Sequence, residues 1–137
     1  ISAWSLLGVC GAFKGIIKPG GSIVTMTYYG STKVIQNYGI MGVAKAALEA
    51  EVRYLADELG ENEIRVNALS AGPIRTLAAA GIRGFKGYLE EVAQRSAIKK
   101  NVTTEEVGSS CRFLISDDSR GITGQVIYVD QGFSTLG

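Results

Sequence analysis

One short stretch of this sequence decides the fold: Ile64-Arg65-Val66-Asn67-Ala68-Leu69-Ser70. Its apolar and β-branched residues predict a buried strand. A helical pattern, with apolar residues every three or four positions, precedes it over residues 38–59, and a second β-branched stretch at residues 22–28 precedes that helix. Strand, helix and strand with this spacing predict a right-handed crossover between parallel strands. We therefore expect an α/β fold built on a parallel sheet.

The rest of the chain extends this pattern in both directions. An apolar helical rhythm covers residues 2–17, and we expect neighbouring segments to cover that helix on most sides. The strand at residues 22–28 is expected to be buried on both faces. Thr103 and Glu106 form a capping box at the start of another helix, and residues 125–129 predict a last buried strand. The chain thus reads as one structural unit.

Residues 76–96 are the ambiguous segment. Their hydrophobic pattern is helical, but Gly81, Gly84 and Gly87 are too many glycines for a stable isolated helix. We therefore predict a mobile lid over this stretch.

Composition limits the classes of function. The chain has 137 residues, of which 46% are hydrophobic and 20% charged, so one domain with a real core is expected. A net charge of +1 with scattered basic residues argues against nucleic acid as a partner. No apolar run reaches the roughly 18 residues of a membrane span, and no signal peptide is visible. The chain lacks histidine, and Cys10 and Cys111 lack metal-ligand spacing, so we expect no metal site and two free thiols in a reducing compartment.

Tyr38 and Lys45 carry the clearest chemical signal. Seven residues apart on the predicted helix, their side chains return to nearly one face. A nearby ammonium favours phenolate over phenol, so it is expected to lower the pKa of the tyrosine, and the same lysine can hold a sugar hydroxyl. One turn further on, Glu49 and Arg53 are read as an i,i+4 pair that faces water.

Three groups of candidate residues are expected at one edge of the sheet. Ligands of open parallel sheets bind beyond the carboxyl ends of the strands. Tyr28 and Tyr29 follow one strand, Tyr38 and Lys45 open the next helix, and the loop at residues 71–76 follows the second strand. The loop's free backbone groups suit a carboxamide, so these residues together predict a ligand site.

The chain resembles the C-terminal half of a short-chain dehydrogenase/reductase, and within that superfamily the enoyl-acyl-carrier-protein reductases of type II fatty acid synthesis. A tyrosine seven residues before a lysine, with a second tyrosine ten residues upstream, is the pattern those enzymes show. Most other superfamily members place the tyrosine four residues before the lysine, as in Tyr29 and Lys33, but these two are predicted to lie in a loop after a strand. The segments that carry the resemblance are 37–45 and 67–78.

The resemblance implies a Rossmann-like doubly wound parallel sheet with helices on both faces, and it implies roles for individual residues. Tyr28, Tyr38 and Lys45 are the implied catalytic residues, with both phenols facing a thioester and Lys45 holding the ribose of a nicotinamide cofactor. The other implied contacts fall into two sets, one for the cofactor and one for the acyl chain. They are Ile74, Arg75, Thr76, Leu77 and Ala78 for the cofactor, and Tyr28, Met41, Ile82, Phe85 and Tyr88 for the acyl chain.

The function implied is the reduction of the trans-2,3 double bond of enoyl-acyl-carrier-protein thioesters with NADH. The implied partners are acyl carrier protein and three further copies in a homotetramer, whose subunits pair through helices 2–17 and 38–59. The implied location is a bacterial cytoplasm, or a plastid-type organelle in a eukaryote. Residues 1–137 would be the catalytic half of one domain, because the glycine-rich phosphate loop of the superfamily is missing.

Two other interpretations stay open. Thr25 and Thr27 offer hydroxyls that suit a 3-oxoacyl or other carbonyl reductase of the same superfamily. Alternatively, the chain is a non-catalytic fragment whose apolar and alanine-rich helices serve only assembly.

Overall fold

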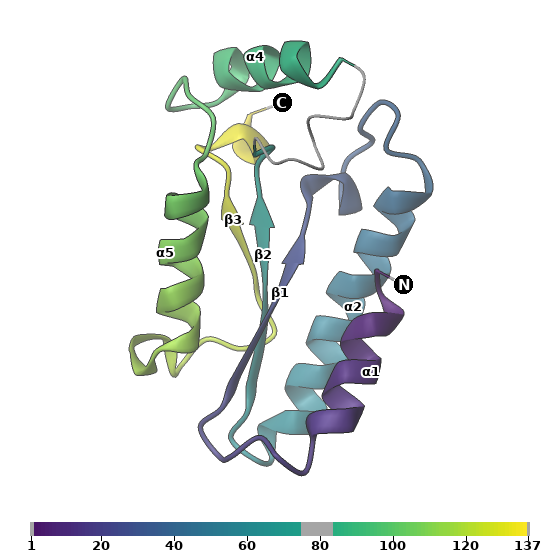
Figure 1. Cartoon of the computed structure of the whole chain (residues 1–137), viewed down its shortest axis with the longest axis vertical. Coiled ribbons are helices and arrows are strands. Elements are labelled where there is room, and N and C mark those ends of the chain that lie inside the picture. Colours follow the sequence, from purple (N-terminus) through teal and green to yellow (C-terminus); the bar gives the residue numbers. More distant parts are fainter. Residues whose placement is uncertain (1, 75–83, 137) are drawn as a thin grey trace.

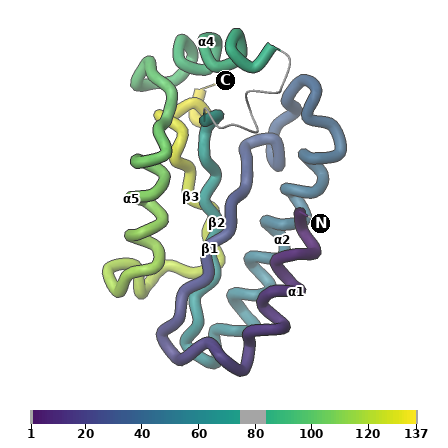
Figure 2. The backbone as a smooth tube through the Cα atoms, viewed as in Figure 1, coloured from purple at the N-terminus to yellow at the C-terminus, as the bar shows by residue number. Residues whose placement is uncertain are grey.

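The computed structural model describes residues 2–74 and 84–136, and three parallel strands form its centre (Figure 1). The backbone trace in Figure 2 follows the chain between the sheet and the helices on either side of it. The elements are α1 (Trp4–Phe13), β1 (Ser22–Thr27), η1 (Tyr29–Ser31), α2 (Ile40–Gly60), β2 (Arg65–Ala71), α4 (Phe85–Arg95), α5 (Thr104–Ile115), η2 (Asp117–Ser119), β3 (Val126–Val129) and η3 (Phe133–Thr135).

The sheet confirms the predicted parallel crossover. Its order is β1-β2-β3, with Ser22 paired to Arg65 at one end of β1 and Ala68 paired to Val126 where β3 joins. All seven residues of β2 are buried. The stretch that decides the fold is therefore the central strand, as its uninterrupted apolar character indicated.

Helices cover both faces of the sheet, as expected for a doubly wound α/β fold. Helices α1 and α2 lie on one face and α5 on the other, while α4 crosses the upper end (Figure 1). Leu48, Val52 and Leu59 of α2 form one core cluster with buried residues of α1 and β2. A second cluster joins Leu69 of β2 to Leu114 of α5. Each cluster buries apolar area on its own side of the sheet, which stabilises the layered arrangement.

Two burial expectations are wrong in the described part of the chain. β1 is an edge strand whose residues are mostly half-buried, and β3 forms the other edge. α1 is shorter than predicted and leaves Trp4 73% and Phe13 49% exposed. The reason is geometric, since α1 contacts α2 on one side while its other side faces solvent.

The capping box before α5 is confirmed. The backbone N–H of Glu106 donates to the Thr103 hydroxyl at 3.2 Å, and the backbone N–H of Thr103 donates to the Glu106 carboxylate at 2.9 Å. A hydrogen bond from Lys100 and the bond from Thr103 lower the pKa of Glu106 to about 2. The local sequence therefore fixes the beginning of this helix.

Arg65 ties the start of β2 to the end of α5. Its side chain is buried, and its guanidinium donates to the carbonyls of Leu114 at 2.9 Å and Ser116 at 3.1 Å and to the hydroxyl of Ser119 at 3.0 Å. These bonds close the end of the sheet opposite to the strands' carboxyl ends. A buried cation held by carbonyls is stabilising only as long as all its donors are used.

Replacing Arg65 by leucine is expected to lower the free energy of unfolding by about 3 kcal/mol, because the carbonyls of Leu114 and Ser116 lose their charged donor and keep only hydrogen bonds from neighbouring serines. Urea denaturation of the full-length protein, followed by circular dichroism, measures this change. Arg112→Leu is the control, since Arg112 donates to Ser109 on the exposed side of α5. Equal midpoints for the two variants would contradict the role of Arg65.

The two cysteines are free thiols, as expected. Cys10 is buried in α1, and Cys111 is partly exposed in α5. Among the helices described here, none is long and apolar enough to cross a membrane.

Candidate active site

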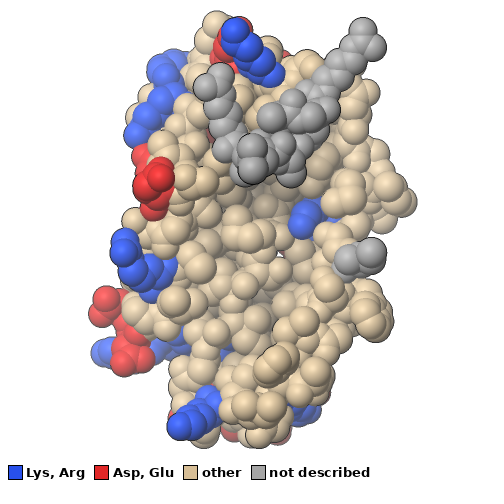
Figure 3. Space-filling model, in the orientation of Figure 1, with Lys and Arg blue, Asp and Glu red and all other residues tan. Residues whose placement is uncertain are grey.

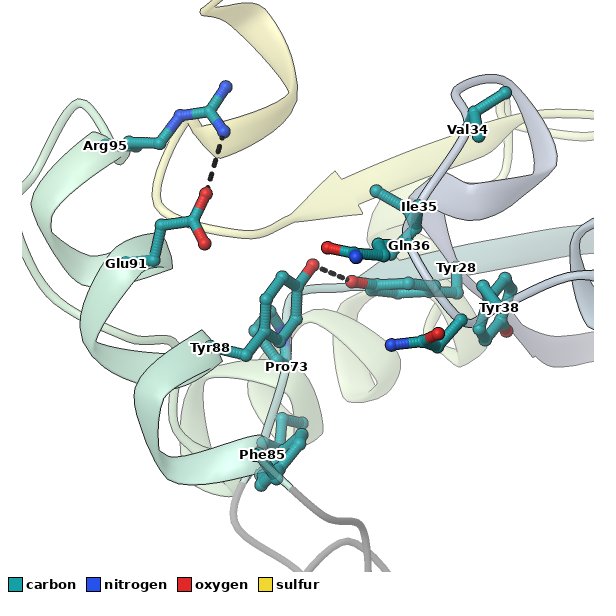
Figure 4. Close-up of a pocket in the computed structure, with 13 residues that line it drawn as sticks. Tyr28, Val34, Ile35, Gln36, Tyr38, Pro73, Phe85, Tyr88, Glu91 and Arg95 are labelled. Atoms are coloured by element: carbon teal, nitrogen blue, oxygen red, sulfur yellow. Dashed lines mark hydrogen bonds and ion pairs between the residues drawn. The ribbon is translucent and has the colours of Figure 1, made fainter.

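A cleft of about 660 Å³ opens at the carboxyl end of β1, between the loop after β1 and helix α4 (Figure 4). Its walls come from three segments of the chain that are distant in sequence. The residues that line it are Tyr28, Val34, Ile35, Gln36, Asn37, Tyr38, Pro73, Ile74, Gly84, Phe85, Tyr88, Glu91 and Arg95. On the face shown in Figure 3, most charged side chains gather along the side where α5 lies, and a basic side chain lies nearer the middle. Most of the residues that line the cleft are apolar or aromatic, so it suits a ligand with a long apolar part.

Tyr38 lies before α2, not within it, so the predicted placement on one helix with Lys45 is wrong. The helix begins at Ile40, and Gly39 has φ of 47°, a conformation that favours glycine. The Tyr38 carbonyl accepts the backbone N–H of Met41 at 3.0 Å. The turn at Gly39 thus sets the direction of the Tyr38 side chain independently of the helical period.

Two glycines make room for the Tyr38 ring. A Cβ atom on Gly30 would lie 2.7 Å from Cε1 of Tyr38, and a Cβ atom on Gly42 would lie 2.7 Å from the Gly30 carbonyl oxygen. Both distances are shorter than van der Waals contact allows. The start of α2 therefore packs closely against η1, with the Tyr38 ring held between them.

Gly30→Ala is expected to push the Tyr38 ring out of this position and to lower kcat by about tenfold, because a small misplacement of a reacting group is costly. The measurement is steady-state turnover in the reaction that the family resemblance implies, with crotonyl thioester and NADH. Gly108→Ala in α5, where a Cβ meets no atom within 4 Å, is the matched control. Unchanged turnover in the Gly30 variant would show that the position of this ring does not matter.

Tyr28 connects the two walls of the cleft. Its ring lies edge-on to that of Tyr38, with 5.0 Å between centroids and 66° between planes. Its hydroxyl forms a hydrogen bond with the hydroxyl of Tyr88, which reaches across from α4 (Figure 4). Tyr28 therefore contacts two other phenols, the Tyr38 ring through its own ring and the Tyr88 hydroxyl through its hydroxyl, and the sequence predicted that Tyr28 and Tyr38 lie together.

These phenols hold their protons firmly. Burial raises the pKa of Tyr28, and its hydrogen bond with Tyr88 raises it further. Burial also raises the pKa of Tyr38 and of Tyr88. The expectation that the cation of Lys45 lowers the pKa of Tyr38 is not met, because burial dominates at Tyr38. At neutral pH all three groups are therefore hydrogen-bond donors.

Lys45 lies in the second turn of α2 and reaches back to the end of β1. Its ammonium donates to the carbonyl oxygen of Met26 at 3.0 Å. Burial lowers the pKa of Lys45, and the negative charge of Glu49 opposes that change. An ammonium has three donors, so two remain for other acceptors. Lys45 is not among the described residues that line the cleft, but its free donors can hold the hydroxyls of a sugar.

Glu49 does not face water, so the predicted surface pair with Arg53 is wrong. Its carboxylate is buried and accepts the hydroxyl of Thr27 at 2.7 Å. The Arg53 guanidinium instead donates to the backbone carbonyl of Glu49 at 2.9 Å. The i,i+4 spacing was real, but packing of α2 against β1 turned the acid inward.

The alternative pair of Tyr29 and Lys33 lies elsewhere. Tyr29 belongs to η1, a single 3-10 turn, and its ring packs edge-on against Tyr128 and Phe133. Lys33 is exposed in the turn that follows. Neither residue lines the cleft, and neither lies on an α-helix, as the sequence predicted.

Comparison with known proteins gives the family. The model of the family described as enoyl-(acyl carrier protein) reductase matches residues 1–134. The chain belongs to this family. It is 53% identical to enoyl-(acyl-carrier-protein) reductase (NADH) FabI of Rickettsia prowazekii and 51% identical to that of Bacillus cereus, over all 137 residues in both cases. It covers 52% and 54% of these two proteins, so the chain spans about half the length of the curated relatives it matches.

Solved structures agree with the family assignment. The B. cereus enoyl-acyl carrier protein reductase, solved with NADP+ and an indole naphthyridinone, superposes with a TM-score of 0.96 at 51% identity, over 100% of this chain and 53% of that one. The NADH-dependent enzyme of Aquifex aeolicus gives 0.95 at 43% identity, over 100% and 54%. The Rossmann-like doubly wound fold of the enoyl reductases is thereby confirmed for this chain.

The structure places the other residues implied by the enoyl reductase family in different ways. Ile74, Phe85 and Tyr88 line the cleft together with Tyr28 and Tyr38. Met41 is 40% exposed on α2 and is not among the described residues that line the cleft. The remaining implied residues lie outside the described part of the chain: Arg75, Thr76, Leu77, Ala78 and Ile82.

The first part of the predicted lid, residues 76–83, lies outside the residues that the structure describes. Most of the described part, Phe85–Arg95, is a regular helix, α4, with Leu89 and Val92 buried. Gly84 has φ of 80° and precedes the helix, and Gly87 lies inside it. The glycines of this segment led us to underestimate the stability of the helix. Burial of Leu89 and Val92 outweighs the low helix propensity of glycine.

Some residues of the cleft were missed. Gln36 and Asn37 come from the loop before Tyr38, and Glu91 and Arg95 form an ion pair of 3.1 Å on α4 (Figure 4). Their polar, solvent-exposed character gave no signal in the sequence. For Asn37, the sequence offered one indication, its position next to the candidate residue Tyr38. Asn37 has a φ of 64°.

Proposed function

We propose that the full-length protein carrying this chain reduces the trans-2,3 double bond of enoyl-acyl-carrier-protein thioesters with NADH, the last step of the elongation cycle. The observation that carries this proposal is the contact between Tyr28 and Tyr38 at the edge of a largely uncharged cleft. Relatives at 51–53% identity are named as NADH-dependent enoyl reductases, which supports the same conclusion. Residues 1–137 would then be the catalytic half of one Rossmann-like domain.

The residues present fit a nicotinamide cofactor. The Lys45 ammonium uses one donor on Met26 and keeps two for vicinal hydroxyls such as those of a ribose. Ile74 lines the cleft at the end of β2, where ligands of open parallel sheets bind. By family resemblance, residues 74–78 would contact the nicotinamide and diphosphate. NADH, when bound, supplies the hydride that reduces the β-carbon of the enoyl group.

Tyr28 and Tyr38 would support the thioester. As the double bond is reduced, negative charge develops on the thioester oxygen, and a neutral phenol directed at that oxygen stabilises it. The raised pKa values of Tyr28 and Tyr38 keep both phenols protonated for this role. The Tyr28 hydroxyl already points into the cleft, where Tyr88 is its partner. The thioester oxygen would lie within reach of the Tyr28 and Tyr38 hydroxyls.

The acyl chain would lie along the apolar lining of the cleft. Val34 and Ile35 approach from the loop after η1, while Phe85 lies at the start of α4 (Figure 4). Acyl carrier protein is the implied partner that delivers the acyl chain. Met41 and Ile82 remain predicted contacts from the family resemblance.

A carbonyl reductase is the weaker interpretation. It needs a free hydroxyl at the end of β1, but the Thr27 hydroxyl is buried and bonded to Glu49. Neither Thr25 nor Thr27 lines the cleft. Tyr28 occupies the place where a donor to the substrate is needed.

A homotetramer is the proposed assembly, in a bacterial cytoplasm. The outer faces of α1 and α2 support it, since Trp4, Phe13, Ile40 and Val43 are all exposed apolar residues. Exposed apolar side chains on two packed helices favour a contact with another protein surface. An assembly role alone would not explain three phenols in one cleft.

Parallel assays with NADH test the proposal. The full-length protein is expected to consume NADH with crotonyl thioester and to leave acetoacetyl thioester unchanged. Turnover of acetoacetyl thioester alone would favour the carbonyl reductase, and no turnover of either would favour the assembly role.

A further inference from the structure

A buried carboxylate lies under the catalytic edge of the sheet, and the proposed reaction does not use it directly. Glu49 is 7% exposed, and its one described hydrogen-bond donor is the Thr27 hydroxyl, at 2.7 Å. Thr27 is itself 5% exposed. Burying a carboxylate is costly unless its charge interacts favourably with its surroundings. A cation nearby would offset that cost.

Lys45 is that cation. It lies one turn before Glu49 on α2, and its ammonium donates to the carbonyl of Met26, the neighbour of Thr27 in β1. Lys45 and Glu49 thus contact two successive residues at the end of one strand. Residues four apart on a helix are neighbours on its surface, so the two charges are close.

Glu49 is the charge that acts on Lys45. Burial lowers the pKa of Lys45, and Glu49 raises it. The elements packed against α2 bring other titratable groups, namely Cys10 from α1, Tyr29 from η1 and Arg65 from β2. None of these contributes to the shift at Lys45, and β1 carries no titratable side chain.

We propose that Glu49 is a positioning residue: its carboxylate keeps the Lys45 ammonium charged and, through Thr27, fixes the end of β1 that carries Tyr28. The consequence for turnover rests on the proposed function, whereas the effect on Lys45 does not. One buried acid would then serve both the lysine that holds the cofactor and the tyrosine that meets the substrate.

Two variants separate the two effects. Glu49→Gln keeps an oxygen that accepts from Thr27 but removes the charge. Thr27→Val removes the hydroxyl but keeps the charge. Glu58→Gln is the matched control, because it removes an exposed acid from the same helix, where Glu58 pairs with Lys14.

The measurement is the acetylation rate of Lys45 by acetic anhydride as a function of pH, in the ligand-free full-length protein, read by mass spectrometry. The reagent attacks only the neutral amine, so the midpoint reports the Lys45 pKa. Glu49→Gln is expected to lower this midpoint by about half a pH unit or more, since losing an opposite charge disfavours the ammonium. Thr27→Val and Glu58→Gln are expected to leave it in place.

Turnover gives the second readout. Glu49→Gln is expected to raise the KM for NADH more than it lowers kcat, and Thr27→Val to lower kcat more than it changes that KM. An unchanged Lys45 midpoint in Glu49→Gln would overturn the proposal, whatever the effect on stability. A lowered midpoint in a protein that reduces no enoyl thioester would support the action on Lys45 and overturn the proposed function.

A double variant keeps the test decisive if Glu49→Gln does not fold. Thr27→Val with Glu49→Met replaces both partners by apolar side chains of similar size, which buried polar pairs usually tolerate. The Lys45 midpoint is again expected at lower pH. A midpoint equal to that of the parental protein would overturn the proposal.

Discussion

Lys45→Met is expected to lower kcat/KM for NADH-dependent reduction of crotonyl thioester by about 100-fold or more. The ammonium at the carboxyl end of β1 is the group that we assign to the cofactor ribose, and methionine has similar length but no donor and no charge. The Met26 carbonyl also loses its partner. Steady-state kinetics and NADH fluorescence on the full-length protein measure the two parts of this effect.

Lys33→Met is the matched control. Lys33 is exposed and forms the alternative tyrosine–lysine pair with Tyr29. Its removal is expected to change kcat/KM by less than about twofold. If the Lys33 variant were the inactive one, the other superfamily pattern would hold and the site would have to be reassigned.

Tyr38→Phe is expected to lower kcat by about 100-fold while leaving the thermal midpoint within a few degrees of the parental value. The ring keeps its place between Gly30 and Gly42, so only the hydroxyl is lost. Circular dichroism on heating and turnover on crotonyl thioester make the two measurements. The loss should appear in kcat rather than in the KM for NADH if the hydroxyl acts on the developing charge.

Tyr29→Phe serves as the control for Tyr38→Phe. The Tyr29 ring packs against Tyr128 and Phe133, away from the cleft, and phenylalanine preserves that contact. Its activity is expected to match that of the parental protein. Full activity in Tyr38→Phe would transfer the donor role to Tyr28 alone, which Tyr28→Phe would then reveal.

The sequence predicted the elements that depend on local or uninterrupted signals. β2 is apolar throughout and is buried throughout. The capping box of Thr103 and Glu106 begins α5 as expected. The gathering of Tyr28 and Tyr38 followed from a general property of parallel sheets, whose ligand sites lie beyond the carboxyl ends of the strands.

Other features depended on three-dimensional context that the sequence does not contain. The helical pattern of the sequence extended back to Tyr38. In the structure the helix begins only at Ile40, because Gly39 has a positive φ. Glu49 lies four residues before Arg53, a spacing that many surface ion pairs share. In the structure β1 packs against Glu49, and the Thr27 hydroxyl donates to its carboxylate. Burial then outweighed the cation at Tyr38 and raised its pKa. The first of these is a local backbone conformation, and the other two are effects of tertiary packing that override a local pattern.

The position of the added proton tests the central claim most directly. Crotonyl thioester, NADH and the full-length protein are incubated in D2O, and the product is analysed by mass spectrometry and NMR. The account predicts a saturated butyryl thioester with one deuterium, located on the α-carbon, and formation of this product should be nearly lost in Tyr38→Phe. Unchanged crotonyl thioester, or acetoacetyl thioester converted to a 3-hydroxy product under the same conditions, would contradict it.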